Sequence, residues 1–442
     1  MAISAARVAA FDILLRVDQQ DAYASELLHA PDHANLSPAD HGLATELVMG
    51  VLRWRSLLDD QIAQRSSLKL AKLDPEVLTC LRLAAYQLLY LDRVPQHASV
   101  HESVELVKRA RKRSAVPFVN AVLRKFAGNI GLPAVVGEAS SAAELASSSA
   151  HPHWLVERWT QALGHSIARR VCGYDQSIPA TCLCIRDPKI ASELESQGIK
   201  LAPGSLLASA RRVIGGDITR AQAFRQSWVA IQDEASQLVA LLVGQGSRIL
   251  DCCAAPGGKT RLLAERNPRA AIVAVELHPH RARLLRKLVS AKNVQIVASD
   301  IRTLPGGELF DHVLVDVPCS GTGTLAHNPE IKWRLKLEDL LDLQNRQLAI
   351  LQSAMQRVAQ GGRLVYSTCS LEPEENQAVV ESALSSDSSF RLTDSREQLR
   401  ELGSQGELAQ KDIEALTSGP YLRTIPGVHP CDGFFAAILQ KN

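Results

Sequence analysis

The chain has 442 residues, of which 46% are hydrophobic and 22% are charged. This composition is typical of a globular protein with two or three domains, and it excludes an intrinsically disordered chain. The formal net charge is only +2. Any attraction to a nucleic acid must therefore come from a local cluster of charge.

Cysteine usage and hydropathy indicate where the protein works. The nine cysteines are an odd number without a regular framework of spacings, and the first residues form an amphipathic pattern rather than a signal segment. No apolar run reaches the about 18 residues that a membrane span needs. We expect a cytoplasmic, monomeric protein with reduced thiols, no membrane contact and no metal.

Residues 1–130 are predicted to form an all-α domain. Apolar residues recur at helical spacing, and "SPAD" from Ser37 and "LDPE" from Leu73 each place Pro at a first helical position. Basic residues gather late in this domain, where they can contact RNA phosphates or form a solvated helix face. The candidate RNA-binding residues are Lys108, Arg109, Arg111, Lys112, Arg113, Arg124 and Lys125.

A linker and a small α+β region are predicted to follow. Residues 131–152 are small, polar and nearly uncharged, which favours a linker. Residues 153–232 contain a helical pattern over 154–172 and two strand-like stretches, "ATCLCIR" and "SWVAIQD". Pattern alone does not give their topology.

Residues 233–442 alternate between apolar strands and amphipathic helices, ending in the strand-like "GFFAAILQ". This alternation predicts an α/β domain with a mostly parallel, Rossmann-like sheet covered by helices on both faces. The polar segment around 383–420 is predicted to be a surface excursion, and the pattern assigns no role to it.

The stretch "DCCAAPGGKT" joins the first strand of this domain to its helix. Pro256, Gly257 and Gly258 permit a sharp turn and close approach of a ligand to the helix N-terminus. A phosphate-binding P-loop requires Gly where Cys253 stands, and the dinucleotide pattern G-x-G-x-x-G is absent from this stretch.

Acidic residues follow three successive strands of the predicted sheet, at Asp251, Glu276 and Asp300. Glu276 is placed to accept hydrogen bonds from ribose hydroxyls, and Asp300 suits an adenine amino group. Three acids without a phosphate cradle favour an adenosyl cofactor with a cationic centre, S-adenosylmethionine. The alternative, weighed most for Asp300, is an acid that only caps the next helix.

Two cysteines lie on loops after strands, in "DVPCSGTG" (Cys319) and "VYSTCSLEPEEN" (Cys369). Methylation of cytosine carbon 5 requires a thiolate to add to carbon 6 and a base to remove the carbon 5 proton. Asp316 could bond to ring nitrogen 3 and the exocyclic amine. The alternatives are buried structural thiols or a zinc site, which the lack of a C-x-x-C pair disfavours.

"DCCAAPGGKT", "DVPCSGTGTLAHNPEIKW" and "YSTCSLEPEEN" together resemble the RNA cytosine-5 methyltransferases of the bacterial RsmB (Sun/Fmu) type. The first 130 residues resemble the NusB-like RNA-binding domain of that family. The resemblance implies that Cys369 attacks carbon 6, that Cys319 assists release of the methylated base, and that Lys259 helps to position substrate or cofactor. It places the cofactor at Cys253, Ala254, Ala255, Pro256, Gly257, Gly258, Lys259, Glu276, Asp300 and Asp316.

The resemblance also implies a substrate, a cytosine in small-subunit (16S) ribosomal RNA. Two alternatives remain open: the same chemistry on transfer RNA or another RNA, and a non-catalytic RNA-binding assembly factor that keeps the methyltransferase fold. The expected architecture is an S-adenosylmethionine-dependent, Rossmann-like α/β domain at 233–442, preceded by the all-α domain, the linker and the small α+β region.

Overall fold

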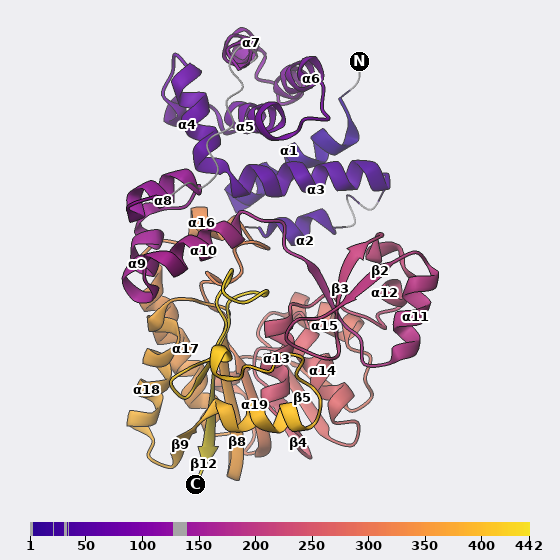
Figure 1. Ribbon diagram of the computed structural model, residues 1–442, viewed down its shortest axis with the longest axis vertical. Coiled ribbons are helices and arrows are strands. Elements are labelled where there is room, and N and C mark those ends of the chain that lie inside the picture. Colours follow the sequence, from indigo (N-terminus) through magenta and orange to yellow (C-terminus); the bar gives the residue numbers. More distant parts are fainter. Residues whose placement is uncertain (1–2, 21, 31–32, 34, 127–138) are drawn as a thin grey trace. The chain divides into compact units, whose positions relative to one another are not determined.

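The computed structural model describes residues 3–20, 22–30, 33, 35–126 and 139–442 (Figure 1). The chain forms two compact units. The helical unit is made of Met1–Ile178 together with Leu325–Leu335, and the catalytic unit of Pro179–Thr324 together with Lys336–Asn442. The chain thus leaves the catalytic unit after Thr324, passes through the helical unit as residues 325–335, and re-enters the catalytic unit at Lys336.

The helical unit is a helix bundle around an apolar core. Ser37 caps α3 by accepting a hydrogen bond from the backbone N–H of Asp40, with Pro38 at the first helical position as predicted. Helix α5 is buried along most of its length. The helices are α1 (Ala5–Gln20), α2 (Ala24–Leu28), α3 (Pro38–Arg53), α4 (Arg55–Arg65), α5 (Pro75–Tyr90), α6 (Gln96–Arg109), α7 (Val116–Arg124), α8 (Ala142–Ser148), α9 (His153–Leu163), α10 (His165–Asp175) and α16 (Ile331–Arg334), with 3₁₀ turns η2 (Leu70–Lys72) and η3 (Arg113–Ala115).

The region after the bundle differs in part from the prediction. Residues 131–138 of the predicted linker lie outside the described residues, while 142–148 of it form helix α8. The single helix predicted over 154–172 is wrong, because Gly164, at φ 85°, separates α9 from α10. Both helices belong to the helical unit, which extends to Ile178.

The catalytic unit begins with a three-stranded antiparallel sheet in the order β1-β3-β2. "ATCLCIR" contains β1 as predicted, whereas "SWVAIQD" is not a strand and makes only an isolated bridge between Ile231 and Leu183. The elements here are β1 (Thr181–Cys184), α11 (Pro188–Ser196), β2 (Lys200–Pro203), β3 (Ala210–Gly215), η4 (Ile218–Arg220) and α12 (Gln222–Arg225).

A nine-stranded sheet forms the rest of this unit, in the order β10-β11-β12-β8-β7-β4-β5-β6, with β9 paired to β12. Its elements are α13 (Glu234–Leu242), β4 (Arg248–Asp251), α14 (Gly258–Arg266), β5 (Ala271–Glu276), α15 (Pro279–Leu288), β6 (Val294–Ala298), η5 (Ile301–Thr303), β7 (Phe310–Asp316), α17 (Asp339–Met355), β8 (Val358–Thr368), η6 (Pro373–Glu375), α18 (Gln377–Ser386), β9 (Phe390–Thr393), α19 (Ser395–Ser404), η7 (Glu414–Leu416), β10 (Thr417–Ser418), β11 (Tyr421–Arg423) and β12 (Phe435–Lys441).

Strands β6, β5, β4, β7 and β8 are parallel, and the remaining strands pair antiparallel at one side. Alternate strand residues pack on opposite faces: Leu314 joins a core with α13, α14 and α19, whereas Val313 and Val315 join a core with α17 and α18. Helices therefore cover both faces, as the alternating pattern predicted (Figure 1).

The polar segment around 383–420 is more ordered than predicted. It contributes β9, α19 and β10, and Leu399 and Leu402 of α19 are fully buried in the core. Its Glu407 forms ion pairs with Arg186 and Arg266. The segment is therefore part of the catalytic unit rather than a surface excursion.

Candidate active site

The strand order reverses between β4 and β7. From β4 the chain adds β5 and β6 on one side, and β7 then pairs with β4 on its other side. Ligands of open α/β sheets bind at the carboxyl ends of strands beside such a switch point. Asp251 ends β4 and Asp316 ends β7. The sequence thus places two carboxylates at the position where this topology forms a site.

The loop after β4 turns sharply into α14 at Gly257, which has φ 119°. A Cβ atom there would lie 2.6 Å from Leu285 and 2.8 Å from Val289. Only glycine combines this backbone conformation with so close an approach of the neighbouring helix. The turn leaves the first N–H groups of α14 at the end of the loop, where they can bind a ligand.

Asp251 is buried beneath this loop. Its Oδ2 accepts a 2.7 Å hydrogen bond from the hydroxyl of Thr260, while no described residue hydrogen-bonds to its buried Oδ1. Burial raises the pKa of the Asp251 carboxyl to about 6. A buried carboxylate oxygen without a partner suits the positively charged end of a ligand.

A cavity of about 510 Å³ opens above the loop, which is within the size range of small-molecule sites. One wall is the loop itself with Asp251 and Asp316, and the other comes from the stretch before α13. Its lining residues are Phe224, Arg225, Ser227, Val229, Ala230, Ile231, Gln232, Ser236, Asp251, Cys253, Ala254, Ala255, Pro256, Gly257, Gly258, Lys259, Arg261, Leu288 and Asp316.

The cavity contains most of the predicted cofactor residues, but Glu276 and Asp300 are not among its lining residues. Glu276 is buried at the end of β5, where its Oε1 accepts a 2.9 Å hydrogen bond from the N–H of His278. Asp300 caps η5 and pairs with Arg302 at 2.6 Å. Its pKa is lowered by the hydrogen bond from Arg302. The capping alternative therefore describes the Asp300 contacts.

The acids nevertheless surround one thiol. Burial raises the pKa of Cys253, and the negative charges of Asp251, Asp316, Glu276 and Asp300 raise it further. This end of the sheet is therefore strongly acidic. A cofactor with a sulfonium and an ammonium group fits a cavity that holds an unpartnered buried carboxylate oxygen, that of Asp251.

Asp316 lies between two neighbours. Its Oδ2 is 2.7 Å from Nζ of Lys259, and its Oδ1 accepts a 2.7 Å hydrogen bond from Ser367. Nζ of Lys259 also lies 5.0 Å from the centre of the Phe434 ring. The ammonium group balances the charge of Asp316 at the cavity wall.

The two predicted catalytic cysteines lie together, with 3.3 Å between Sγ of Cys319 and Sγ of Cys369. Their hydrogen bond and burial raise the pKa of Cys319 well above its ordinary value. Both follow the carboxyl ends of adjacent parallel strands, β7 and β8. Two loops far apart in the sequence thus present a pair of thiols at one point.

A buried carboxylate holds the two cysteine loops side by side. Oε1 of Glu375 accepts hydrogen bonds from the N–H of Ser320 and from Gln347, both at 2.8 Å. Its Oε2 accepts from the hydroxyls of Ser320 and Ser370. Each serine directly follows one of the cysteines, so Glu375 joins the two loops next to the thiols.

Glycine permits a second contact between the loops. The N–H of Gly323 donates to the carbonyl of Cys369 at 2.9 Å, and the carbonyl of Gly323 accepts from the N–H of Gly433 at 2.8 Å. A Cβ atom on Gly323 would lie 2.2 Å from the carbonyl oxygen of Gly433. The loop after Cys319 is therefore fixed against its neighbours by its backbone.

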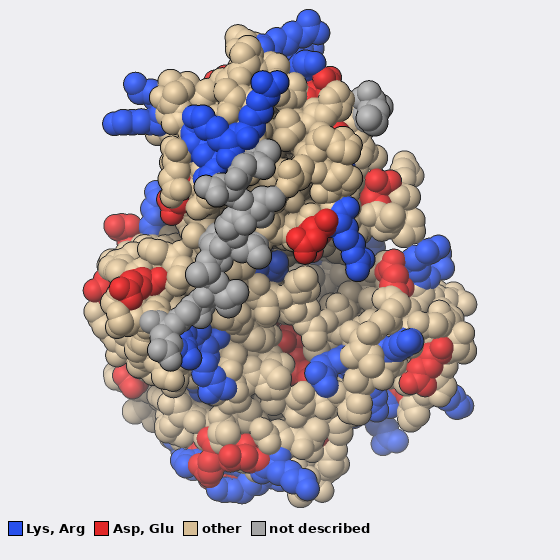
Figure 2. Space-filling model, turned by 45° about the horizontal axis from the view of Figure 1, so that its top comes forward, with Lys and Arg blue, Asp and Glu red and all other residues tan. Residues whose placement is uncertain are grey.

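The predicted RNA-binding residues divide into two groups. Lys108, Arg109 and Lys112 form ion pairs with acids of the helical unit. Nζ of Lys125 donates to the carbonyl of Arg65. Arg111, Arg113 and Arg124 are exposed. Lys and Arg side chains gather at the end of the helical unit drawn at the top of Figure 2.

Sequence reasoning missed two parts of the site. The stretch from Phe224 to Gln232 lines the cavity although its apolar alternation suggested a strand. Glu375 lies in "YSTCSLEPEEN", where the pattern alone gives it no role, although an acid so close to a candidate catalytic cysteine is a usable signal.

In the described part of the chain, no helix is long and apolar enough to cross a membrane.

The fold resembles that of solved proteins. The protein PH0851 has a TM-score of 0.82 and 23% identity, with 100% of both chains covered. NSun6 from Pyrococcus horikoshii, solved with SFG, has a TM-score of 0.56 and 19% identity over 66% of this chain and 98% of that chain. A sequence model of the NusB family matches residues 4–128. The fold is therefore a Rossmann-like α/β unit combined with a NusB-like helical unit.

Relatives of the same length identify the family. The protein named probable ribosomal RNA small subunit methyltransferase B of Bacillus subtilis (strain 168) is 31% identical, with 98% of each chain covered. Ribosomal RNA small subunit methyltransferase B of Vibrio cholerae serotype O1 is 31% identical over 92% of this chain and 91% of its own. A sequence model described as 16S rRNA methyltransferase RsmB/F matches residues 238–440. The chain belongs to this RsmB/F family of RNA methyltransferases.

Proposed function

We propose that this protein methylates carbon 5 of a cytosine in 16S ribosomal RNA through a covalent bond between Cys369 and carbon 6 of the base. The observation that carries the proposal is the 3.3 Å separation of the Cys319 and Cys369 sulfur atoms, on loops that follow β7 and β8. The ribosomal substrate is supported by the names of relatives that match over nearly the whole chain.

The residues have separate roles in this reaction. The Cys369 thiolate adds to carbon 6, which makes carbon 5 nucleophilic. Asp316 and its partner Lys259 stabilise the polarised base. The bound cofactor supplies a methyl group activated by a sulfonium. Cys319 then takes the carbon 5 proton, and the bond between sulfur and carbon 6 breaks to restore the aromatic ring.

The electrostatics of the thiol pair support this division. The hydrogen bond with Cys369 and burial raise the pKa of Cys319, so Cys319 begins the reaction as a protonated thiol. Cys319 loses its own proton to solvent after the adduct has formed, and the raised pKa then makes its thiolate a strong base for the carbon 5 proton. Attack and release are thereby assigned to different sulfur atoms.

The cofactor is proposed to bind in the cavity above the loop from Cys253 to Lys259, with Asp251 facing its cationic end. Glu276 and Asp300, at the ends of the neighbouring strands, remain the proposed residues for the ribose and the adenine. Arg111, Arg113 and Arg124 are the proposed phosphate contacts of the helical unit, because they are exposed and, unlike Lys108, Arg109 and Lys112, form no ion pair among the described residues. The proposed setting is the cytoplasm, where thiols stay reduced.

A denaturing gel tests the division of roles. The Cys319→Ala variant, given S-adenosylmethionine and transcribed small-subunit RNA, should accumulate a protein–RNA adduct that resists denaturation. Cys369→Ala and the double variant should form none. Trapping by Cys369→Ala alone would reverse the two roles.

The same experiment separates the remaining functions. Incorporation of methyl label into transfer RNA but not into small-subunit RNA would show that transfer RNA, and not 16S ribosomal RNA, is the substrate. Binding of RNA by the wild-type protein without label in either RNA would indicate a non-catalytic assembly factor.

A further inference from the structure

The chain that carries Cys319 does not stay in the catalytic unit. After Thr324 it enters the helical unit, forms α16 and leaves again at Leu335. Lys332 is almost fully buried, with 1% of its surface exposed. A lysine is seldom buried unless its charge is paired or hydrogen-bonded. Its contacts therefore indicate what this segment does.

Side chains of the segment bind the carboxyl end of α3. Nζ of Lys332 donates to the carbonyl of Arg53 at 2.9 Å, and Nε1 of Trp333 donates to the carbonyl of Leu52 at 2.6 Å. The last carbonyls of a helix lack partners within the helix and carry its negative dipole end. An ammonium group and an indole N–H satisfy two of them here.

Lys332 also joins α3 to the helices that follow the bundle. Its Nζ donates to the carbonyl of Ala150, two residues after α8 ends, at 3.0 Å. Burial lowers the pKa of Lys332 to about 7, while the negative charge of the buried Asp175 opposes that shift. Asp175 in turn pairs with His151 at 3.2 Å. One buried ammonium group thus binds two separate parts of the helical unit.

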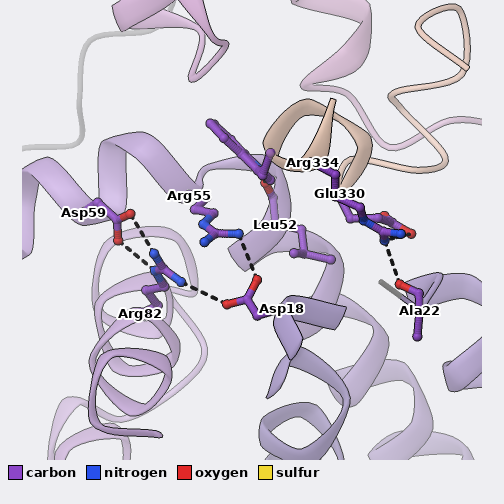
Figure 3. Close-up of polar contacts among 9 residues, drawn as sticks. Asp18, Ala22, Leu52, Arg55, Asp59, Arg82, Glu330 and Arg334 are labelled. Carbon is purple, nitrogen blue, oxygen red and sulfur yellow. Dashed lines mark hydrogen bonds and ion pairs between the residues drawn. The ribbon is translucent and has the colours of Figure 1, made fainter. Parts of the chain in front are cut away.

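Further hydrogen bonds join the segment to α2 and to the residues just before it. Oε1 of the buried Glu330 accepts from the N–H of Ala24 at 2.8 Å. Arg334 donates to the carbonyl of Ala22 at 2.6 Å (Figure 3). Arg53 donates to the carbonyl of Ala326 at 3.2 Å. The segment is therefore held along its length, from Ala326 to Arg334.

The segment follows a buried, hydrogen-bonded loop. Residues 320–324 are buried, and Gly321, at φ 73°, and Gly323 allow the close turns of its backbone. Within the catalytic unit the loop is held at Ser320 and Gly323. Only a short stretch separates Gly323 from Ala326, the first anchored residue in the helical unit. A displacement of the anchor is therefore transmitted to the thiol loop.

We propose that the helical unit positions the catalytic loop, and that Lys332 is the principal positioning residue for Cys319. The inference rests on the proposed function in one respect, the role of Cys319 in releasing the methylated base. Lys332 itself does not contact the reacting atoms in this proposal. It limits the movement of the loop by fixing the segment that follows it.

The first experiment needs neither RNA nor activity. Lys332→Met keeps the apolar stem of the side chain and removes its three N–H donors. Hydrogen–deuterium exchange of the full-length protein should be faster in peptides covering 316–324 than in the wild type, and unchanged in β4 and β5. Lys336→Met, an exposed lysine just beyond the segment, is the matched control and should exchange like the wild type.

Kinetics then separate positioning from folding. Lys332→Met should bind S-adenosylhomocysteine as the wild type does, with kcat lowered on the order of 10- to 100-fold. Its protein–RNA adduct should accumulate, because release depends on the position of Cys319. A structural role alone would lower thermal stability and leave both kcat and adduct level unchanged.

Two results would overturn the inference. The first is faster exchange confined to the helical unit, with 316–324 unchanged. The second is normal release of the adduct by Lys332→Met. If this variant does not fold, Trp333→Phe, which removes one donor and keeps the ring, takes its place with the same expected direction. Failure of the wild type to methylate any RNA would sink the proposed function, while the exchange experiment would still decide the inference.

Discussion

Nζ of Lys259 lies 2.7 Å from Oδ2 of Asp316, so the first helix after β4 and the end of β7 are joined by an ion pair at the cavity wall. Both side chains are mostly shielded from solvent, with 13% and 25% of their surfaces exposed. The pair links the residues of the cofactor loop to those of the cysteine loop. Its charge balance matters for both binding and catalysis.

Lys259→Met should lower kcat/KM by about 10- to 100-fold. This range corresponds to the loss of a charge-assisted hydrogen bond, which contributes about 1.5–3 kcal/mol. Asp316 would lose its cationic partner and polarise the base less effectively. Steady-state methylation assays measure the effect. Lys259→Arg should retain part of the activity that Lys259→Met loses. An unchanged rate in Lys259→Met would show that the ion pair with Asp316 has no role in the reaction.

Asp251 should make stability depend on pH. Its folded pKa of about 6 lies above the ordinary value of 3.8. It therefore contributes stability that is fully present below about pH 4 and is lost as pH rises through 6. The difference of about two between the folded and ordinary pKa values corresponds to about 3 kcal/mol.

The measurement is chemical denaturation of the wild type and Asp251→Asn between pH 4 and 7.5. The difference in free energy of unfolding, wild type minus variant, should fall across this range. A constant difference would show that Asp251 titrates normally. Bound S-adenosylhomocysteine should reduce the slope for the wild type, because its ammonium group favours the charged carboxylate.

Glu375→Gln should destabilise the catalytic unit by about 1.5–3 kcal/mol, because an amide cannot accept all the hydrogen bonds that the carboxylate accepts. The change should also separate the two cysteine loops and slow methylation. Differential scanning calorimetry and the adduct assay measure the two effects. Glu374→Gln, at the neighbouring and more exposed position, is the control.

Gly323→Ala should disturb the cysteine loop directly. The new methyl group would meet the carbonyl oxygen of Gly433 at 2.2 Å, and backbone must move to relieve the clash. We expect a cost of about 1–3 kcal/mol and a loss of activity larger than the loss of stability. Gly307→Ala has open space around its Cβ position and should behave as the wild type.

Arg113→Gln together with Arg124→Gln should weaken RNA binding without changing cofactor affinity. For every phosphate that is no longer neutralised, the slope of log affinity against log salt concentration should become shallower by roughly 0.7–0.9. Filter binding at several salt concentrations gives this slope. Lys108→Gln should change it less, because Lys108 is paired with Glu105 at 2.6 Å.

The sequence predicts most of the fold because its signals are local. Strand ends at Asp251, Glu276 and Asp316, together with the glycines after Asp251, define the sheet and the cofactor loop. The motif resemblance predicts the family, which the relatives confirm. The roles of Cys319 and Cys369 remain predictions, although the structure brings the two thiols together.

The errors arise where contacts between distant residues decide the structure. Nothing near Ile231 indicates that its stretch lines a cavity instead of forming a strand, since the opposing wall is supplied by residues after Asp251. The interruption between helices α9 and α10 at Gly164 depends on one backbone angle, the φ of Gly164. "NPEIKW" carries no signal that Lys332 is buried, because its partners, Arg53 and Ala150, are remote in sequence.

The return of residues 325–335 to the helical unit has a consequence for synthesis of the chain. A ribosome that has finished Ile178 must still translate the first half of the catalytic unit before Lys332 exists. At about 5–20 residues per second, that delay is on the order of 10 s. During this interval the end of α3 lacks the hydrogen bonds that Lys332 and Trp333 donate, so the nascent helical unit is exposed to chaperones and proteases in an incomplete state.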